Sequence, residues 1–279
     1  MKILCLHGFG TNPGIMKRQM SALIKHCDPR WQFDFLAGNV ECPGAPGVEA
    51  FPGPYLCWSS DYGPLSIRAA LDLIHETFQS EGPFDGVFGF SQGAAIIAAY
   101  LLEQADLYPD RPLPVRFGIF CCSTPILTAD PDYIYNLYGT LSDEDIRRLR
   151  SGEGDQIAQL PDSVRPAADV LVKGLAAMAP VHGDSLSYFL NRPFSEIPGV
   201  VLPDQYKPRL SIPTLHIYGK DDPVSLKEAC IFNAAFCDPR WRKLYRHSTI
   251  HNIPRSPTDV KEVVSLMESM ISHGQRSRL

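Results

Sequence analysis

The 279-residue sequence has no excess of positive charge and no long hydrophobic run. Lys and Arg number 26 against 31 Asp and Glu, which gives a formal net charge of −5. Without a basic surface to neutralise phosphates, nucleic-acid binding is not expected. The longest apolar run, at positions 94–102, is far shorter than the roughly 20 residues that a membrane-spanning helix needs. We therefore expect no membrane span, while a hydrophobic content of 44% can bury a sizeable core.

Motifs for metals, cofactors and disulfide frameworks are also missing. The 8 cysteines include the adjacent pair Cys121 and Cys122 but no Cys-x-x-Cys, and the His and Cys positions show no zinc spacing. No Gly-x-Gly-x-x-Gly follows the first expected strand, and no Gly-Lys-Ser/Thr phosphate loop occurs. The sequence therefore predicts no metal, no cofactor and no disulfide framework.

The two ends of the sequence bear on where the protein resides. The apolar stretch at positions 3–6 is too short for the core of a signal peptide and runs into a glycine-rich turn, which favours an intracellular protein. The last three residues, Ser277-Arg278-Leu279, resemble a conservative variant of the Ser-Lys-Leu peroxisomal signal. A cytoplasmic or a peroxisomal location is therefore expected.

Short β-rich runs alternate with helical patterns along the chain. The expected strands cover residues 3–6, 33–36, 86–90, 116–121, 214–218 and 243–245. Apolar residues recur at helical spacing in 64–80 and in 260–271, and the second of these helices begins with the capping sequence Ser256-Pro257-Thr258-Asp259. The alternation predicts an α/β fold with a mostly parallel sheet and helices on both faces. No linker interrupts it, so we expect a single domain over residues 1–279.

About 90 residues separate the fourth expected strand from the fifth, which is more than a helical crossover requires. An apolar stripe at helical spacing runs from Val164 to Met178, and aromatic residues such as Tyr133 and Phe189 fall in the same segment. This composition predicts a helical, lid-like insertion over residues 126–210. The alternative is a helical addition that only enlarges the core.

The most specific chemical motif is Gly89-Phe90-Ser91-Gln92-Gly93. Because it follows an expected strand and precedes a helical run, it fits the strand-turn-helix context of a nucleophile elbow. The glycines allow a turn so tight that the Ser91 hydroxyl projects above the sheet edge. An ordinary tight turn is the alternative interpretation.

A serine hydroxyl becomes an effective nucleophile only beside a base that a third group orients. His251 follows the last expected strand and precedes the capped C-terminal helix, and His247, four residues earlier, is the alternative base. Asp221 and Asp222 both follow an expected strand and a turn glycine, so either carboxylate is a candidate to orient the histidine. The order serine, acid, histidine is the one found in α/β-hydrolases.

Such chemistry also needs N–H donors for the oxyanion that develops on the substrate carbonyl. The backbone amide of Gln92, directly after the nucleophile, is one expected donor. The turn His7-Gly8-Phe9-Gly10 follows the first expected strand, and its glycines let the main chain approach the site. We therefore expect the Phe9 amide to be the second donor.

Four segments together resemble the FSH (family of serine hydrolases) type of α/β-hydrolase, which includes the OVCA2-like esterases. They are residues 6–10, 82–94, 219–224 and 251–254. The run Gly-Pro-Phe-Asp-Gly-Val leading into Gly-Phe-Ser-Gln-Gly is the most specific of them. The resemblance extends from residue 1 to about residue 272, apart from the insertion.

The resemblance implies an α/β-hydrolase fold and esterase or thioesterase chemistry, with Ser91 as nucleophile and His251 as base. The family's Gly-x-x-Asp-x-Val pattern selects Asp222 rather than Asp221 as the acid. Trp58 lies in a loop that resembles a family segment on the substrate side, so it is expected to bind substrate, or else to anchor its own turn.

Fungal members of the family are often associated with secondary metabolism, and some release polyketide acyl chains from a carrier domain. The implied partner is therefore a small-molecule acyl ester or thioester, free or carrier-bound. Two other functions stay open: a non-hydrolytic binding or cyclising protein on a hydrolase scaffold, and a peptidase that uses the same three residues. The sequence says nothing about the oligomeric state.

Overall fold

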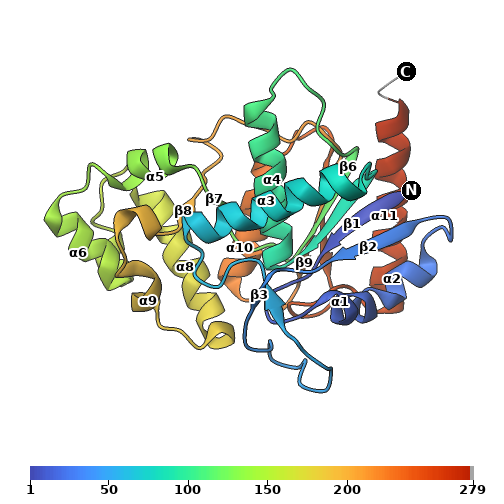
Figure 1. Cartoon of the computed structure of the whole chain (residues 1–279), viewed down its shortest axis with the longest axis horizontal. Helices are drawn as coiled ribbons and strands as arrows, with labels where there is room; N and C mark the ends of the chain where they lie inside the picture. Colours follow the sequence, from blue (N-terminus) through green and yellow to red (C-terminus); the bar gives the residue numbers. More distant parts are fainter. Residues whose placement is uncertain (277–279) are drawn as a thin grey trace.

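The six expected strands form one parallel sheet flanked by helices (Figure 1). Its strand order is β10-β9-β6-β5-β1-β2. They are β1 (Lys2–Leu6), β2 (Gln32–Leu36), β5 (Gly86–Phe90), β6 (Phe117–Cys121), β9 (Thr214–Gly219) and β10 (Arg242–His247). The computed structural model describes residues 1–276, so the tripeptide Ser277-Arg278-Leu279 lies outside the described residues. The prediction of a mostly parallel α/β sheet is confirmed.

Helices cover both faces of this sheet because successive strand side chains point to opposite sides. Val87 and Phe120 belong to the core on one face, whereas Phe88 and Ile119 belong to the core on the other. The first face is covered by α3 (Pro64–Glu81) and α4 (Gln92–Leu107), and the second by α1 (Pro13–Gln19), α2 (Ser21–His26) and α11 (Pro257–Arg276). Helices α3 and α11 bury the apolar stripes that their sequence spacing predicts.

The C-terminal helix begins where its capping sequence predicts. The backbone N–H of Asp259 donates to Ser256 Oγ at 3.1 Å, which satisfies one of the free donors of the first turn. The Asp259 carboxylate in turn accepts from the Ser248 hydroxyl and the Tyr245 hydroxyl. Helix α11 is thereby tied to the loop that follows β10.

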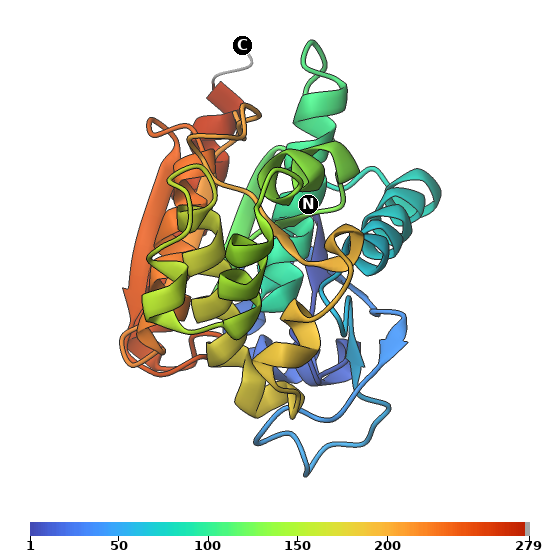
Figure 2. The ribbon, with the colours of Figure 1, turned by 90° about the vertical axis from the view of Figure 1, so that its left-hand side faces the viewer.

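The chain between β6 and β9 forms a separate group of helices at one end of the sheet, and Figure 2 looks onto it. Its elements are β7 (Leu127–Thr128), α5 (Pro131–Tyr138), α6 (Asp143–Ser151), α7 (Gly154–Ile157), α8 (Arg165–His182), α9 (Leu186–Leu190) and β8 (Gly199–Val200). These elements share a third hydrophobic core that includes Leu149, Leu171 and Phe189. Polar contacts that tie the group to the rest of the chain include Arg192 with Asp61 at 3.0 Å, and His182 Nε2 with the Tyr62 hydroxyl at 2.5 Å.

A short antiparallel ribbon, β3 (Val40–Glu41) and β4 (Leu56–Cys57), lies beside the turn that follows β1. Leu56 accepts a backbone hydrogen bond from Gly10 at 3.0 Å and donates one to Thr11 at 2.7 Å.

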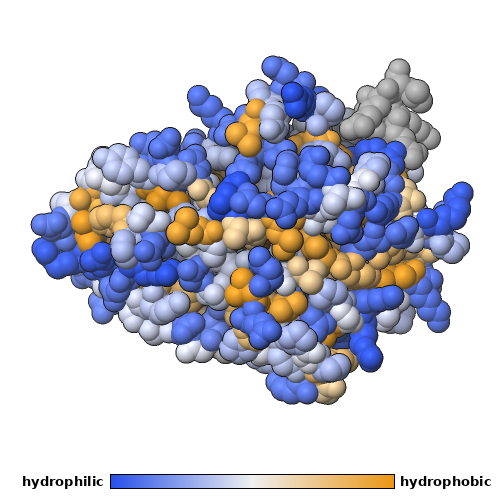
Figure 3. Space-filling view, in the orientation of Figure 1, coloured by the Kyte–Doolittle hydropathy of each residue, from blue (hydrophilic) through white to orange (hydrophobic). Residues whose placement is uncertain are grey.

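Figure 3 shows hydrophobic residues in scattered groups on a mostly hydrophilic face. Within residues 1–276, no helix is both long enough and apolar enough to cross a membrane.

Candidate active site

Ser91 occupies the sharp turn between β5 and α4. Its φ of 53° lies in a region that side chains other than glycine rarely adopt. A Cβ at Gly89 would stand 2.4 Å from the Cα of Ala94, and a Cβ at Gly93 would stand 2.4 Å from the carbonyl oxygen of Leu6. Only glycine fits at both positions, so the motif folds into a turn that presents the Ser91 hydroxyl at the carboxyl edge of the sheet.

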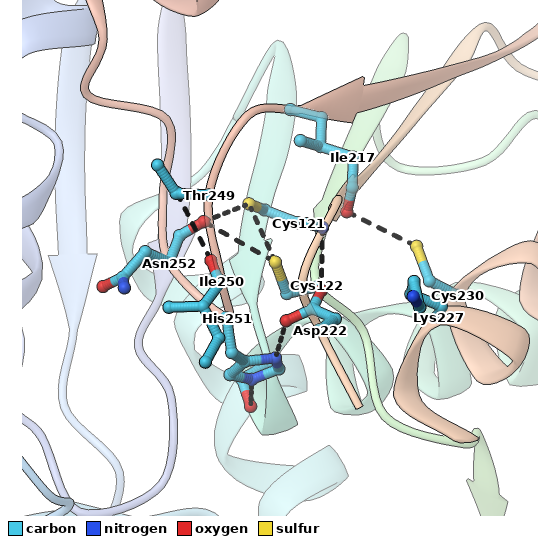
Figure 4. A network of polar contacts seen from close by, with 12 residues as sticks. Cys121, Cys122, Ile217, Asp222, Lys227, Cys230, Thr249, Ile250, His251 and Asn252 are labelled. Carbon is cyan, nitrogen blue, oxygen red and sulfur yellow. Dashed lines mark hydrogen bonds and ion pairs between the residues drawn. The ribbon is translucent and has the colours of Figure 1, made fainter. Parts of the chain in front are cut away.

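His251 reaches this hydroxyl from the loop after β10. Its Nε2 lies 2.9 Å from Ser91 Oγ. Its Nδ1 lies 3.2 Å from Asp222 Oδ1 (Figure 4). The His251 side chain is 24% exposed, so one edge of the ring faces the open side of the site. Ser91, His251 and Asp222 thus form a continuous hydrogen-bonded line across three loops at one sheet edge.

Asp222 is almost fully buried behind His251, in the turn between β9 and α10 (Val224–Asn233). Its Oδ2 accepts the backbone N–H of Gly219 at 2.7 Å. Burial acts to raise the pKa of Asp222, but the hydrogen bond and positive charge of His251 and the Gly219 hydrogen bond outweigh it and hold the pKa below its ordinary value. The carboxylate therefore stays ionised while it orients the imidazole.

The two alternatives from the sequence lie elsewhere. Asp221 is exposed, and its backbone N–H donates a hydrogen bond to the Thr249 carbonyl. His247 is fully buried, with its Nδ1 3.1 Å from Thr249 Oγ1 and its Nε2 3.8 Å from the Cys122 thiol. Neither residue is hydrogen-bonded to Ser91 among the described residues.

Two adjacent thiols support the histidine loop, a role that the sequence reasoning missed. Cys121 Sγ and Cys122 Sγ lie 3.9 and 3.6 Å from the carbonyl oxygen of Asn252, the residue after His251 (Figure 4). The hydrogen bond with Cys121, together with burial, raises the pKa of Cys122 well above its ordinary value. Cys122, Asp222 and His251 have ligand-type atoms within 4.8 Å of one another. Since a metal requires the thiolate, this protonated thiol fits a packing role beside the acid better than a metal site.

The two expected oxyanion donors flank Ser91. Within the described residues, the backbone N–H groups of Phe9 and Gln92 donate to no protein acceptor, and Phe9 lines the same cavity as Ser91. The Gln92 side chain points away from that cavity, since its Oε1 accepts from Trp58 N at 2.9 Å and its Nε2 donates to Ser59 O at 2.6 Å. Both main-chain donors are therefore free for a ligand oxygen.

Trp58 does not lie where the sequence resemblance implied. Its side chain is fully buried and is absent from the lining of the cavity at Ser91. Its indole N–H donates to the His7 carbonyl at 2.7 Å, while its backbone N–H donates to the Gln92 side chain. Trp58 thereby bridges the two loops that carry the expected oxyanion donors, which fits the alternative that it anchors its own loop better than the expected substrate contact.

His7 fixes the first of these loops. Its Nε2 accepts the backbone N–H of Gly38 at 3.0 Å, so its Nδ1 carries the proton and donates to the Gly8 carbonyl at 2.8 Å. Burial lowers the pKa of His7 to about 4. The ring is therefore neutral. From its buried position it stabilises the turn that contains Phe9 through its hydrogen bond to Gly8.

A cavity of about 360 Å³ opens at Ser91 and His251, within the size range of small-molecule sites. Its walls are mostly apolar: Phe9 comes from the loop after β1, Val48 from the loop between β3 and β4, and Ala177, Met178 and Val181 from α8. No Lys or Arg lines it among the described residues. A cavity of equal volume between α3, α4 and β7 contains neither the serine nor the histidine, so chemistry rather than size identifies the site.

Comparison with known proteins finds similar sequences along most of the chain. The model of the family described as serine hydrolase (FSH1) matches residues 1–263. The chain is 35% identical to the serine hydrolase cnsH of Penicillium expansum over 85% of this chain and 98% of that protein. It is 32% identical to the esterase alnB of Emericella nidulans over 100% of this chain and 99% of that one.

Among solved structures, the enol-lactonase of Burkholderia xenovorans LB400 superposes with a TM-score of 0.50 at 18% identity. The match covers 96% of this chain and 91% of the lactonase chain. At this level of identity the likeness concerns the α/β-hydrolase fold alone, which agrees with the sheet and its flanking helices.

Proposed function

Because the chain belongs to the serine hydrolase (FSH1) family and is therefore an enzyme, we propose that it cleaves a carboxylic ester or acyl thioester through an acyl-enzyme on Ser91. The observation that carries the proposal is the hydrogen-bonded line from Ser91 Oγ to His251 at 2.9 Å and on to Asp222 at 3.2 Å. This is the arrangement that activates a serine hydroxyl.

In the first half of the reaction, His251 Nε2 takes the hydroxyl proton as Ser91 Oγ attacks the carbonyl carbon. Asp222 holds the imidazole in the required tautomer and stabilises its positive charge. The tetrahedral intermediate collapses when His251 returns the proton to the departing alcohol or thiol. Water then attacks the acyl-Ser91 ester with His251 again as base, which releases the acid and restores the serine.

The amides of Phe9 and Gln92 are the proposed donors to the developing oxyanion. Loss of one such donor typically lowers kcat by about 10²–10³-fold. The bonds of Trp58 to His7 and Gln92 support their assignment, because they hold both donor loops from behind.

The proposed substrate is a small, uncharged acyl compound. The cavity wall supplies apolar contacts and no cation among the described residues, so a charged acyl group would lose hydration without gaining a partner.

We propose that residues 126–210 act as a lid-like insertion of a single domain 1–279, since α8 forms one wall of the cavity. Secondary metabolism and a carrier-bound substrate, both implied by the resemblance, stay predictions.

The proposal is tested with a fluorophosphonate probe and intact-mass measurement. The purified protein is expected to gain a single adduct, and Ser91→Ala is expected to gain none while it keeps the wild-type fold by circular dichroism. Ser80→Ala, on the exposed face of α3, is the matched control and should label as the wild type does. A folded wild-type protein that gains no adduct would contradict the proposal and favour a non-hydrolytic binding or cyclising protein.

A second measurement separates the substrate types. An oxoester and a thioester of one acyl chain, offered beside a peptide panel, should rank the three leaving groups by kcat/KM. Turnover of the peptide panel above both esters would replace the esterase proposal with a peptidase.

A further inference from the structure

The cavity at Ser91 ends against α8, and Met178 forms part of that wall. The same side chain lines a second, smaller cavity between α8 and the loop after β6. Among the residues that the structure describes, the two cavities share no other lining residue. Met178 is 7% exposed and therefore stands as a partition between them.

The second cavity is suited to hydrocarbon rather than to water. It measures about 30 Å³ and is lined mainly by apolar side chains, among them Leu171, Leu175 and Val200. The hydroxyl of Tyr62, one of its polar lining groups, is already bonded to His182. A water molecule needs two to four polar partners, which this wall does not present.

Of the groups between the two cavities, the Met178 side chain can move more easily than the backbone of α8. A Cβ at Gly174, one turn before Met178, would lie 3.0 Å from Pro125 Cγ, so α8 already lies close to the opposite loop. Methionine is unbranched and flexible, and it adapts to irregular apolar space more readily than other large side chains. A small displacement of the Met178 side chain would connect the two cavities.

The chemistry decides which part of a substrate points toward Met178. The leaving group must depart before water resolves the acyl-enzyme, so it belongs at the open side of the cavity, beside the exposed residue Ile250. The acyl group stays bonded to Ser91 throughout and belongs at the inner end, which Met178 closes.

We propose that Met178 sets the acyl-chain length that the enzyme accepts, and that the small cavity beyond it is a subsite for the distal end of an apolar acyl chain. This inference rests on the proposed esterase function. It names the substrate class of the site as esters or thioesters of a linear apolar acid.

The test compares p-nitrophenyl esters from butyrate to dodecanoate on wild type and Met178→Ala. Removal of Cγ, Sδ and Cε joins the two cavities, so the dodecanoate to butyrate ratio of kcat/KM should rise at least tenfold. Each further buried methylene is worth about fourfold, the equivalent of about 0.8 kcal/mol. Met178→Leu, which conserves volume, should keep the wild-type ratio.

Controls distinguish this effect from loss of packing. Met267→Ala removes the same atoms from the core on the other face of the sheet, and its ratio should equal that of the wild type. If Met178→Ala does not fold by circular dichroism, Met178→Val shortens the same side chain with less loss of volume and should raise the ratio in the same direction. Acetate esters of alcohols of increasing length should show no change in preference in either variant.

The outcomes separate the two proposals. A wild-type enzyme that turns over no ester would overturn the esterase function itself. An active wild type whose chain-length ratio is unchanged in folded Met178→Ala or Met178→Val would overturn only the subsite. A shift confined to the alcohol series would also overturn it, because the leaving group would then face Met178.

Discussion

The sheet with its flanking helices and the segment between β6 and β9 contribute different parts of the site. Ser91, Asp222 and His251 all lie on loops at the carboxyl edge of the sheet. The inserted segment holds none of them, yet α8 supplies Ala177, Met178 and Val181 to the cavity wall. The proposed chemistry thus resides in one region, and the shape that selects a substrate resides largely in the other.

The two regions are also held together differently. Each face of the sheet has a core that runs across several strands, whereas the insertion packs mainly around its own core. The bond of Tyr62 to His182 and the pair of Asp61 and Arg192 tie them at the boundary. Phe9 packs on the His182 ring, with 3.7 Å between ring centroids, so α8 touches the turn that carries a proposed oxyanion donor.

The largest expected effect comes from Asp222→Asn, at the sheet edge. The amide would keep the volume of the carboxylate but favour the wrong tautomer of His251, so kcat should fall by about 10⁴-fold. Steady-state kinetics on a p-nitrophenyl ester give the value. Asp221→Asn is the matched control, because among the described residues the exposed Asp221 side chain makes no hydrogen bond or ion pair with His251; equal losses in both variants would refute the assignment.

The next largest effect concerns the insertion. Leu149 is fully buried in its core, and Leu149→Ala should cost about 2–5 kcal/mol of unfolding free energy through the cavity it leaves. Urea denaturation measures the loss. If the chemistry resides at the sheet edge, the rate of fluorophosphonate labelling of the folded variant should stay within about twofold of wild type. A labelling rate that falls in proportion to the free energy of unfolding would show that the reactivity of Ser91 depends on the insertion as well as on the sheet edge.

Trp58→Phe tests the bridge between the oxyanion loops. The change deletes the indole donor to His7 and leaves that buried carbonyl unpaired, at a cost of about 1–3 kcal/mol. Part of that cost should appear as a tenfold or greater loss of kcat with KM nearly unchanged, because the bridge positions the proposed oxyanion donors, which would act in the transition state. A rise in KM at constant kcat would instead restore the substrate contact that the sequence resemblance implied.

The smallest effect is a pH dependence of stability at the boundary between the regions. Burial lowers the pKa of His182 to about 4 from its ordinary 6.5. Between pH 6.5 and pH 4, the His182 ring is therefore protonated in the unfolded chain but neutral in the folded protein. The free energy of unfolding consequently decreases as the pH falls from 6.5 toward 4. His182→Gln should reduce this acid-dependent loss by about 1–2 kcal/mol, a figure discounted for partial solvent access. Urea midpoints at pH 7 and pH 4.5 measure it.

His216 provides the comparison within the sheet. It is fully buried in β9, and burial lowers its pKa to about 3. His216→Gln should therefore also reduce the acid sensitivity, and by at least as much as His182→Gln. If the urea midpoint falls equally between pH 7 and pH 4.5 in wild type and in both variants, neither ring stays neutral in the folded protein.

Much of the fold could be predicted because the information is local in the sequence. Glycines at 89 and 93 are needed by the turn around Ser91, whatever packs against it. Alternation of short apolar runs with helical stripes predicts a parallel sheet, and such a sheet gathers its loops at one edge. The serine, both candidate acids and both candidate histidines were therefore expected near that edge without any knowledge of contacts.

Tertiary structure decided what depends on contacts between distant residues. Asp221 and Asp222 are adjacent and chemically equal, and only the packing of the turn beneath the His251 loop buries one and exposes the other. Trp58 occurs in a loop that could face either way, and its bonds to His7 and Gln92 turn it inward.

The sequence by itself determined the α/β sheet, the strained turn at Ser91 and the chain order of its partners, because neighbours along the chain impose them. The place of Met178 at the junction of two cavities was decided only when α8 packed against loops from the other region. An apolar stripe reveals that a helix will bury a face, but the surface it meets is set by segments far away in the chain.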